Sequence, residues 1–76
     1  MSSSLYMEGA VDNKVKELRT AAGLRQEDLA RRVAVSRQTI ISIETGRYNP
    51  SLELAWRLSR ALGVRIEDLF MFEEGD

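Results

Sequence analysis

Two adjacent polar side chains near the middle of the chain carry the groups that read nucleic-acid bases. Arg37 and Gln38 are followed at helical spacing by Ser42. In a helix the three share an outer face, because Ile40 and Ile43 occupy the inner face. Arginine and glutamine donors match the guanine and adenine edges exposed in a DNA major groove. The pattern predicts recognition of bases, and a solvated helix face is the alternative.

An apolar residue, Ile41, lies on the same outer face as Thr45. An isoleucine in that position is expected either to touch a thymine methyl group or to pack against a neighbouring loop. The first of these is a base contact, so Ile41 joins the predicted base contacts.

The composition argues against catalysis. The sequence has no Cys and no His, which excludes a disulfide framework, a structural zinc, a thiol nucleophile and an imidazole base. Seventy-six residues make one small domain with no room for a large catalytic cleft. We therefore expect no enzyme, no cofactor, no metal and no small-molecule ligand.

The charges are unevenly distributed. Residues 13–47 carry eight Lys and Arg against four Asp and Glu, a net charge of +4, so in a chain of net charge −1 the remainder carries −5. A basic middle and an acidic C-terminal third suit a protein that turns one face toward phosphates. Ordinary scatter of surface charge is the alternative.

No stretch has the length or apolar character of a membrane span or a signal peptide, so we expect a cytoplasmic, nucleoid-associated protein. Residues 1–11 are predicted to be a flexible arm or leader. Residues 12–72 form the domain, and residues 73–76 a solvated acidic tail.

Apolar spacing predicts five helices and no strand, hence an all-α fold. The expected ranges are 13–22, 26–33, 37–45, 52–62 and 66–71. Asp12 or Asn13 is expected to cap the first helix, whereas Ser36 and Ser51 are expected to cap the third and fourth. Arg25 is a poor cap, so the second helix is expected to begin weakly. The apolar stripe of the fourth helix is predicted as Leu52, Ala55, Leu58, Ser59 and Leu62.

The second and third helices are separated by residues 34–36 alone, which forces a steep crossing, as in a helix-turn-helix. The segment from Leu18 to Gly46, continuing to Phe70, resembles the lambda-repressor-like, or Cro-type (XRE), helix-turn-helix family over about 70% of the chain. The resemblance implies a compact five-helix DNA-binding domain and a prokaryotic transcriptional regulator that binds double-stranded DNA.

The resemblance also assigns roles to individual residues. It implies base contacts by Arg37, Gln38 and Ser42, and contacts to the DNA backbone by Gln26, Thr39, Arg47, Tyr48 and Asn49. The family usually has Ser or Thr at the positions of Arg25 and Arg65, so Arg25 is predicted to contact a phosphate instead. Ala34 stands where Gly is common and should be tolerated if its backbone stays near a helical angle.

The same resemblance pairs Arg19 with Glu44 across the first and third helices. A partly buried ion pair can cost as much in desolvation as it returns. Its expected role is therefore to orient the third helix rather than to stabilise the fold.

Trp56 lies beside the apolar stripe of its helix, either as a core edge or as an exposed interface anchor. Similar repressors form dimers through the fourth and last helices, which predicts a homodimer interface of Leu54, Trp56, Met71 and Phe72, and a two-fold operator. The alternative function is a protein-interaction module, an antitoxin-like or adaptor subunit that uses Trp56 and residues 70–72.

Overall fold

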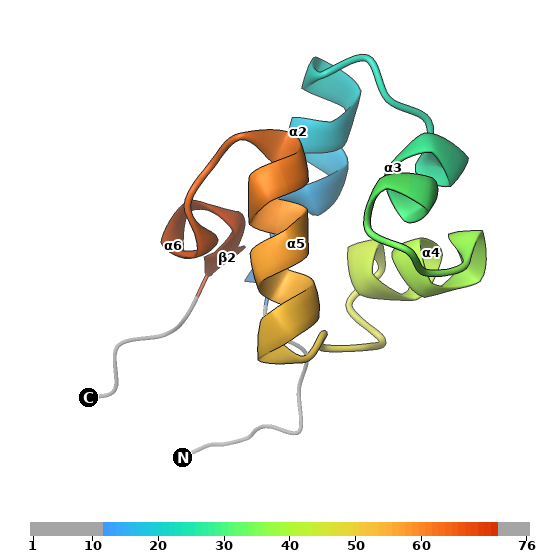
Figure 1. The fold of residues 1–76 in the computed structure, drawn as a ribbon. Helices are drawn as coiled ribbons and strands as arrows, with labels where there is room; N and C mark the ends of the chain where they lie inside the picture. Colours follow the sequence, from blue (N-terminus) through green and yellow to red (C-terminus); the bar gives the residue numbers. More distant parts are fainter. Residues whose placement is uncertain (1–11, 72–76) are drawn as a thin grey trace.

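A computed structural model describes residues 12–71, and the predictions for residues 1–11, Phe72 and 73–76 lie outside this range. The described chain forms five α-helices and two short strands (Figure 1). In chain order they are β1 (Asp12–Asn13), α2 (Val15–Ala21), α3 (Gln26–Arg32), α4 (Arg37–Glu44), α5 (Leu52–Leu62), α6 (Ile66–Leu69) and β2 (Phe70–Met71). The five predicted helices are confirmed, with every end within two residues of the expected one.

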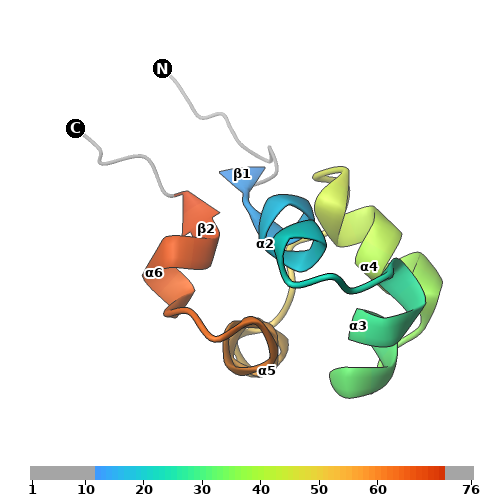
Figure 2. The same cartoon turned by 90° about the horizontal axis from the view of Figure 1, so that it is seen from above.

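The two strands correct the expectation that the chain has none. Asp12 pairs with Met71 and Asn13 with Phe70 in an antiparallel sheet, so the last helix ends at Leu69 rather than at residue 71. The strands come from opposite ends of the described chain and lie together in Figure 2. Two-residue strands are too short for an alternating pattern to show in the sequence.

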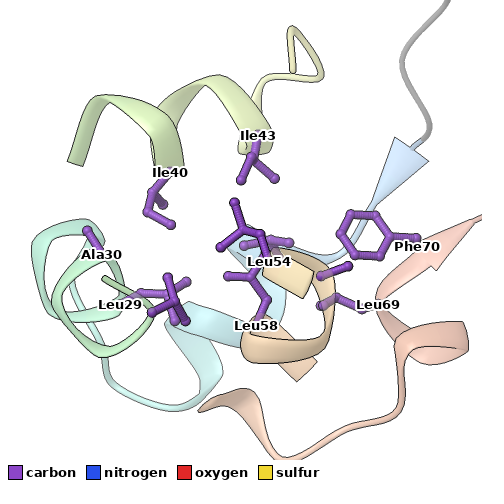
Figure 3. Close-up of a cluster of buried hydrophobic side chains, with 11 residues drawn as sticks. Leu29, Ala30, Ile40, Ile43, Leu54, Leu58, Leu69 and Phe70 are labelled. Carbon is purple, nitrogen blue, oxygen red and sulfur yellow. The ribbon is translucent and has the colours of Figure 1, made fainter. Parts of the chain in front are cut away.

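The core is formed where α5 packs among the other helices. Seven side chains have less than 2% of their surface exposed: Leu29, Ile40, Ile43, Leu58, Leu69, Val15 and Val33. Figure 3 shows the cluster drawn together from α3, α4, α5 and the α6–β2 end. Full burial of an aliphatic side chain contributes about 1.5–3 kcal/mol. The inner face of α4 is thereby fixed, and with it the orientation of its outer face.

Two predictions for the start of α5 are wrong: Leu52 was expected in the buried stripe and Leu54 at an exposed interface. Leu52 is 79% exposed, whereas Leu54, predicted at a dimer interface, is 7% exposed and belongs to the core. Residues two apart on a helix point about 200° away from each other, so the two cannot share a face. Leu54 takes the inner position because the other elements cover the side of α5 that it shares with Ala55 and Leu58.

Helix starts follow the predicted capping chemistry in two of three cases. Ser36 Oγ accepts from Thr39 N at 3.1 Å, and Ser51 Oγ accepts from Leu54 N at 3.2 Å. At α2 the N-cap residue is Lys14, which gives no side-chain bond; Asn13 Oδ1 accepts instead from Val15 N at 3.1 Å. Two serine caps are therefore confirmed, and Asn13 acts from one residue further back.

The turn between α3 and α4 corrects the expectation for Ala34. Its φ is +63°, in the left-handed region, rather than near a right-handed helical angle. Residues 33–36 join the two helices, and Val35 N donates to Ala30 O at 3.0 Å. An L-residue with a Cβ adopts this conformation at a cost of about 1–2 kcal/mol. The turn between α3 and α4 is therefore locally strained at Ala34.

Candidate nucleic-acid interface

The outer face of α4 is open to solvent over its first turn. Arg37 and Gln38 are exposed, Ile41 and Ser42 are half-buried, and Ile40 is fully buried. Within residues 12–71, Arg37 takes part in no ion pair, so its guanidinium is available to a ligand. The predicted base contacts therefore share one side of one helix.

A shallow polar hollow lies between α4 and the loop that follows it. Five side chains line it: Ser36, Gln38, Thr39, Ser42 and Tyr48. The hydroxyl oxygens of Ser36 and Thr39 lie 3.0 Å apart, and Tyr48 is 45% exposed. The structure thus brings two predicted base contacts together with two predicted backbone contacts.

The loop after α4 presents the remaining predicted backbone contacts. Gly46 turns the chain with φ +80°, a conformation that glycine adopts without steric cost. Arg47 N then donates to Ser42 O at 2.9 Å, which holds the start of the loop against α4. Arg47 and Asn49 are both exposed. They flank Tyr48, which lines the hollow.

A buried polar cluster, the Glu44 node, joins three elements behind this face. Arg19 Nε donates to Glu44 Oε2 at 2.6 Å, its second nitrogen Nη2 to Oε1 at 3.3 Å, and Nη1 to Leu24 O at 2.8 Å. The two side chains are only 9% and 3% exposed. The predicted pair is confirmed, and its burial is deeper than that of a surface ion pair.

Gln26 is a third member of the Glu44 node, and its bond to Glu44 was not predicted from the sequence. Its Nε2 donates to Glu44 Oε1 at 3.1 Å. An amide nitrogen carries two hydrogens, so one remains for a phosphate oxygen. The predicted phosphate contact is therefore held by the same carboxylate that holds Arg19. A separation of 18 residues left no local signal of this bond.

Arg25 is engaged by neighbouring acids at the start of α3. Asp28 Oδ2 accepts from Arg25 N at 2.9 Å and from Arg25 Nε at 3.2 Å. Glu27 Oε2 lies 3.4 Å from Arg25 Nη2. The side-chain bond to Asp28 raises the pKa of Arg25, and the backbone bond from Arg25 lowers the pKa of Asp28. Asp28 thus offsets the expected weakness of this helix start. The guanidinium, 73% exposed, reaches a phosphate only in competition with Asp28.

Three large apolar side chains are exposed on α5 and β2, and we refer to them together as the Trp56 surface. It comprises Leu52, Trp56 and Met71, which are 79%, 52% and 48% exposed. The Arg60 guanidinium lies 5.1 Å from the centroid of the Trp56 ring, within cation–π range. Trp56 is thus an exposed side chain and not a core edge. Leu52 replaces the buried Leu54 in this set.

Two other kinds of site, a membrane span and a metal centre, find no support in residues 12–71. None of its helices is long and apolar enough to cross a membrane. Over residues 12–71, no three acidic side chains gather closely enough to hold a metal ion. The outer face of α4 and the Trp56 surface are the two candidate sites that the sequence predicted.

Known proteins resemble this chain in both sequence and fold. Residues 15–69 match the helix-turn-helix family HTH_3. The chain is 52% identical over 64 residues to the uncharacterized HTH-type transcriptional regulator MJ0272 of Methanocaldococcus jannaschii, covering 84% of this chain and 97% of that protein. It is 50% identical over 62 residues to the uncharacterized regulator YgzD of Bacillus subtilis, covering 82% and 94%.

A solved structure shares the fold at lower identity. The restriction-modification controller protein C.AhdI of Aeromonas hydrophila superposes with a TM-score of 0.69 and 36% sequence identity, over 72% of this chain and 83% of that one. A transcriptional regulator from Listeria innocua superposes over 86% of this chain with a TM-score of 0.71 at 19% identity, which shows the fold alone.

Proposed function

The chain belongs to the helix-turn-helix family, and from this premise we propose that it is a sequence-specific DNA-binding regulator of transcription. The observation that carries the proposal is the outer face of α4. Arg37 and Gln38 project from it into solvent while Ile40 and Ile43 anchor the opposite face in the core. The relatives are named as transcriptional regulators, and none of those we compared is named as an enzyme.

In the proposed complex α4 lies in the major groove. Arg37, Gln38 and Ser42 contact base edges, and Ile41 touches a thymine methyl group. The DNA backbone is held by a second set that surrounds α4, consisting of Arg25, Gln26, Thr39, Arg47, Tyr48 and Asn49. The hollow shared by Gln38, Ser42 and Tyr48 supports this division, because it places the two kinds of contact side by side.

We propose further that two copies bind a two-fold operator. A single module of this size covers about 600–1,000 Å² of DNA interface, too little for tight specific binding at physiological salt. A two-fold axis near the Trp56 surface would place the two α4 helices about 34–36 Å apart, one turn of duplex. The exposure of Leu52, Trp56 and Met71 supports this location.

Selection of bound sites from random duplexes tests the DNA-binding proposal. Arg37→Ala and Gln38→Ala should each lower affinity for the selected site by about 1–3 kcal/mol and relax specificity at one or two base pairs. Arg47→Ala should weaken all sequences alike and reduce the salt slope by about one. Lys16→Ala, an exposed change on α2, is the control for loss of positive charge. Failure to enrich any sequence would overturn the proposal.

The dimer is tested by sedimentation of Trp56→Ala. The variant should be monomeric and lose operator binding while keeping its helical content, because Trp56 lies outside the core. Glu53→Ala, an exposed change on the same helix, is the matched control and should remain dimeric. A wild-type protein that stays monomeric at high concentration would contradict this part of the proposal.

The alternative function is a protein-interaction module, and the Trp56 surface is the observation that favours it. An apolar partner bound there would be nearly insensitive to salt, whereas DNA affinity falls steeply as salt rises. A salt titration of the bound complex therefore distinguishes the two functions.

A further inference from the structure

Asn13 makes two side-chain hydrogen bonds in opposite directions along the chain. Its Oδ1 accepts from Val15 N at 3.1 Å, at the start of α2. Its Nδ2 donates to Ile43 O at 2.9 Å, across 30 residues. Both polar groups of this half-buried amide are therefore used, one locally and one at a distant element.

The carbonyl that Asn13 reaches lies in the last turn of α4, where helical carbonyls lack partners within the helix. Ile43 O also accepts from Gly46 N at 3.0 Å, the bond that closes the turn into the Arg47 loop. The Ile43 side chain is fully buried, so this end of α4 is fixed to the core on one side and to Asn13 on another.

The backbone of Asn13 belongs to the strand pair. Asn13 pairs with Phe70 in the sheet, and the next residue, Lys14, donates from its N to Leu69 O at 2.8 Å. In Figure 2, β1 lies between β2 and the C-terminal end of α4. One side chain thus links the β1–β2 pair to the helix that carries the predicted base contacts.

We propose that Asn13 is a positioning residue that couples the β1–β2 pair to the orientation of α4 and its following loop. The proposal rests on the proposed function, since α4 is taken as the DNA-reading helix. Met71 is exposed and pairs with Asp12 on the same strand as Asn13, so a partner bound at Met71 would act on α4 through the same link. Asn13 itself touches no DNA in this arrangement.

Two variants separate the long bond from the local one. Asn13→Ser keeps a hydroxyl oxygen able to accept from Val15 N but is too short to reach Ile43 O. Asn13→Asp keeps the acceptor, and its carboxylate faces the Ile43 carbonyl with no hydrogen to donate. The control is Asp12→Ser, an exposed change on the same strand that leaves the Ile43 bond intact.

The first measurement needs no DNA. Amide hydrogen exchange of Gly46 and Arg47, at the end of α4, should accelerate several-fold in Asn13→Ser and Asn13→Asp while amides in the middle of α5 keep their wild-type rates. The control Asp12→Ser should match the wild type. Unchanged exchange at Gly46 in both Asn13 variants would overturn the proposal whether or not the chain binds DNA.

The second measurement uses the duplex selected by the wild-type protein. Asn13→Ser should weaken its binding by about 3- to 10-fold, with an unchanged salt slope, because no phosphate contact is removed. A wild-type chain that selects no duplex would instead count against the proposed function and leave the exchange result standing. Accelerated exchange with wild-type affinity would show that the link does not act on α4 as a DNA reader, and would also overturn the coupling.

Discussion

Two turns of the molecule are built from nearly the same seven residues. Residues 23–29 read GLRQEDL and residues 63–69 read GVRIEDL. Gly23 and Gly63 have φ values of +76° and +72°, and each precedes an apolar residue and an arginine in extended conformation. In both turns the arginine Nε donates to the aspartate three residues later at 3.2 Å.

The two turns differ at their second and fourth positions; the second is apolar in both, so the fourth residue decides what each turn faces. Gln26 sends its amide into the Glu44 node beside the proposed DNA interface. Ile66 packs against the hydrophobic core. The same local turn therefore begins both α3 and α6. The role of each helix start depends on its first side chain, which contacts a polar neighbour at Gln26 and an apolar core at Ile66.

Loss of Arg19, which supports the first turn through the Glu44 node, should have the largest effect on the free energy of unfolding. Arg19→Met leaves the Glu44 carboxylate buried with Gln26 as its remaining side-chain donor, and removal of one partner of a buried pair costs about 3–5 kcal/mol. Thermal unfolding should show this loss directly. This cost comes from leaving a buried charge uncompensated, so it is compatible with the expectation that the pair orients α4 rather than stabilising the fold.

The double variant Arg19→Met, Glu44→Leu sharpens this prediction. Replacing both charges with apolar groups should recover most of the lost stability, since a buried pair is often neutral against an apolar replacement. Gln26 then loses its support, so operator binding should stay weak. A double variant with wild-type DNA affinity would show that the Glu44 node does not serve the interface.

Exchanging the fourth residues of the two turns should give opposite effects on stability and binding. Ile66→Gln should lower the free energy of unfolding by about 1–3 kcal/mol, because it places an amide against the core. Gln26→Ile should lower the free energy of unfolding by less than Ile66→Gln, because Arg19 Nη2 still donates to Glu44 Oε1 at 3.3 Å, and should lower DNA affinity by about 1–3 kcal/mol through loss of a phosphate contact. Denaturant unfolding and duplex titration of both variants check the pair, and equal destabilisation by the two would contradict it.

A third turn lacks the glycine that the other two share. Ala34 has φ +63°, close to the angles of Gly23 and Gly63. Ala34→Gly should therefore raise the free energy of unfolding by about 1 kcal/mol, through relief of the left-handed strain. The melting temperature should rise by roughly 4–8 °C for a domain of this size. A decrease would mean that flexibility gained by the unfolded chain outweighs the strain.

The smallest expected effect on stability comes from Asp28 and Asp68, the aspartates that accept hydrogen bonds within the two turns. Bonds from Arg25 and Arg65 lower the pKa values of Asp28 and Asp68 below the ordinary 3.8. A lowered folded-state pKa gives stability that is present above the unfolded value and is lost as pH falls through the folded one. The contribution should therefore be complete above the unfolded value of 3.8 and be lost progressively as pH falls below it toward the folded-state pKa.

Asp28→Asn and Asp68→Asn test this pH dependence, because asparagine keeps the acceptor and removes the charge. Each variant should flatten the acid side of the melting temperature against pH. Asp28→Asn should have the greater effect, since its bond to the backbone N is 2.9 Å against 3.4 Å, and its side chain is less exposed. Identical acid profiles for variants and wild type would contradict the assigned bonds.

Local features of the sequence were enough to predict the helices and the face that α4 presents. Ser36 and Ser51 cap helices where expected, because a cap is a bond between residues two or three apart. The helical spacing of Ile40 and Ile43 predicted the exposed side of α4, since two buried residues three apart define the inner face of a helix. The Arg19–Glu44 pair, by contrast, followed only from the family resemblance.

Only the tertiary structure decided which contacts form between distant residues. The choice of Leu54 over Leu52 for the core depends on the neighbours of α5, because either register satisfies a helical period. The bonds of Gln26 to Glu44 and of Asn13 to Ile43 span 18 and 30 residues, beyond any local pattern. Such contacts exist because packing brings their elements together, and no periodicity along the chain records that proximity.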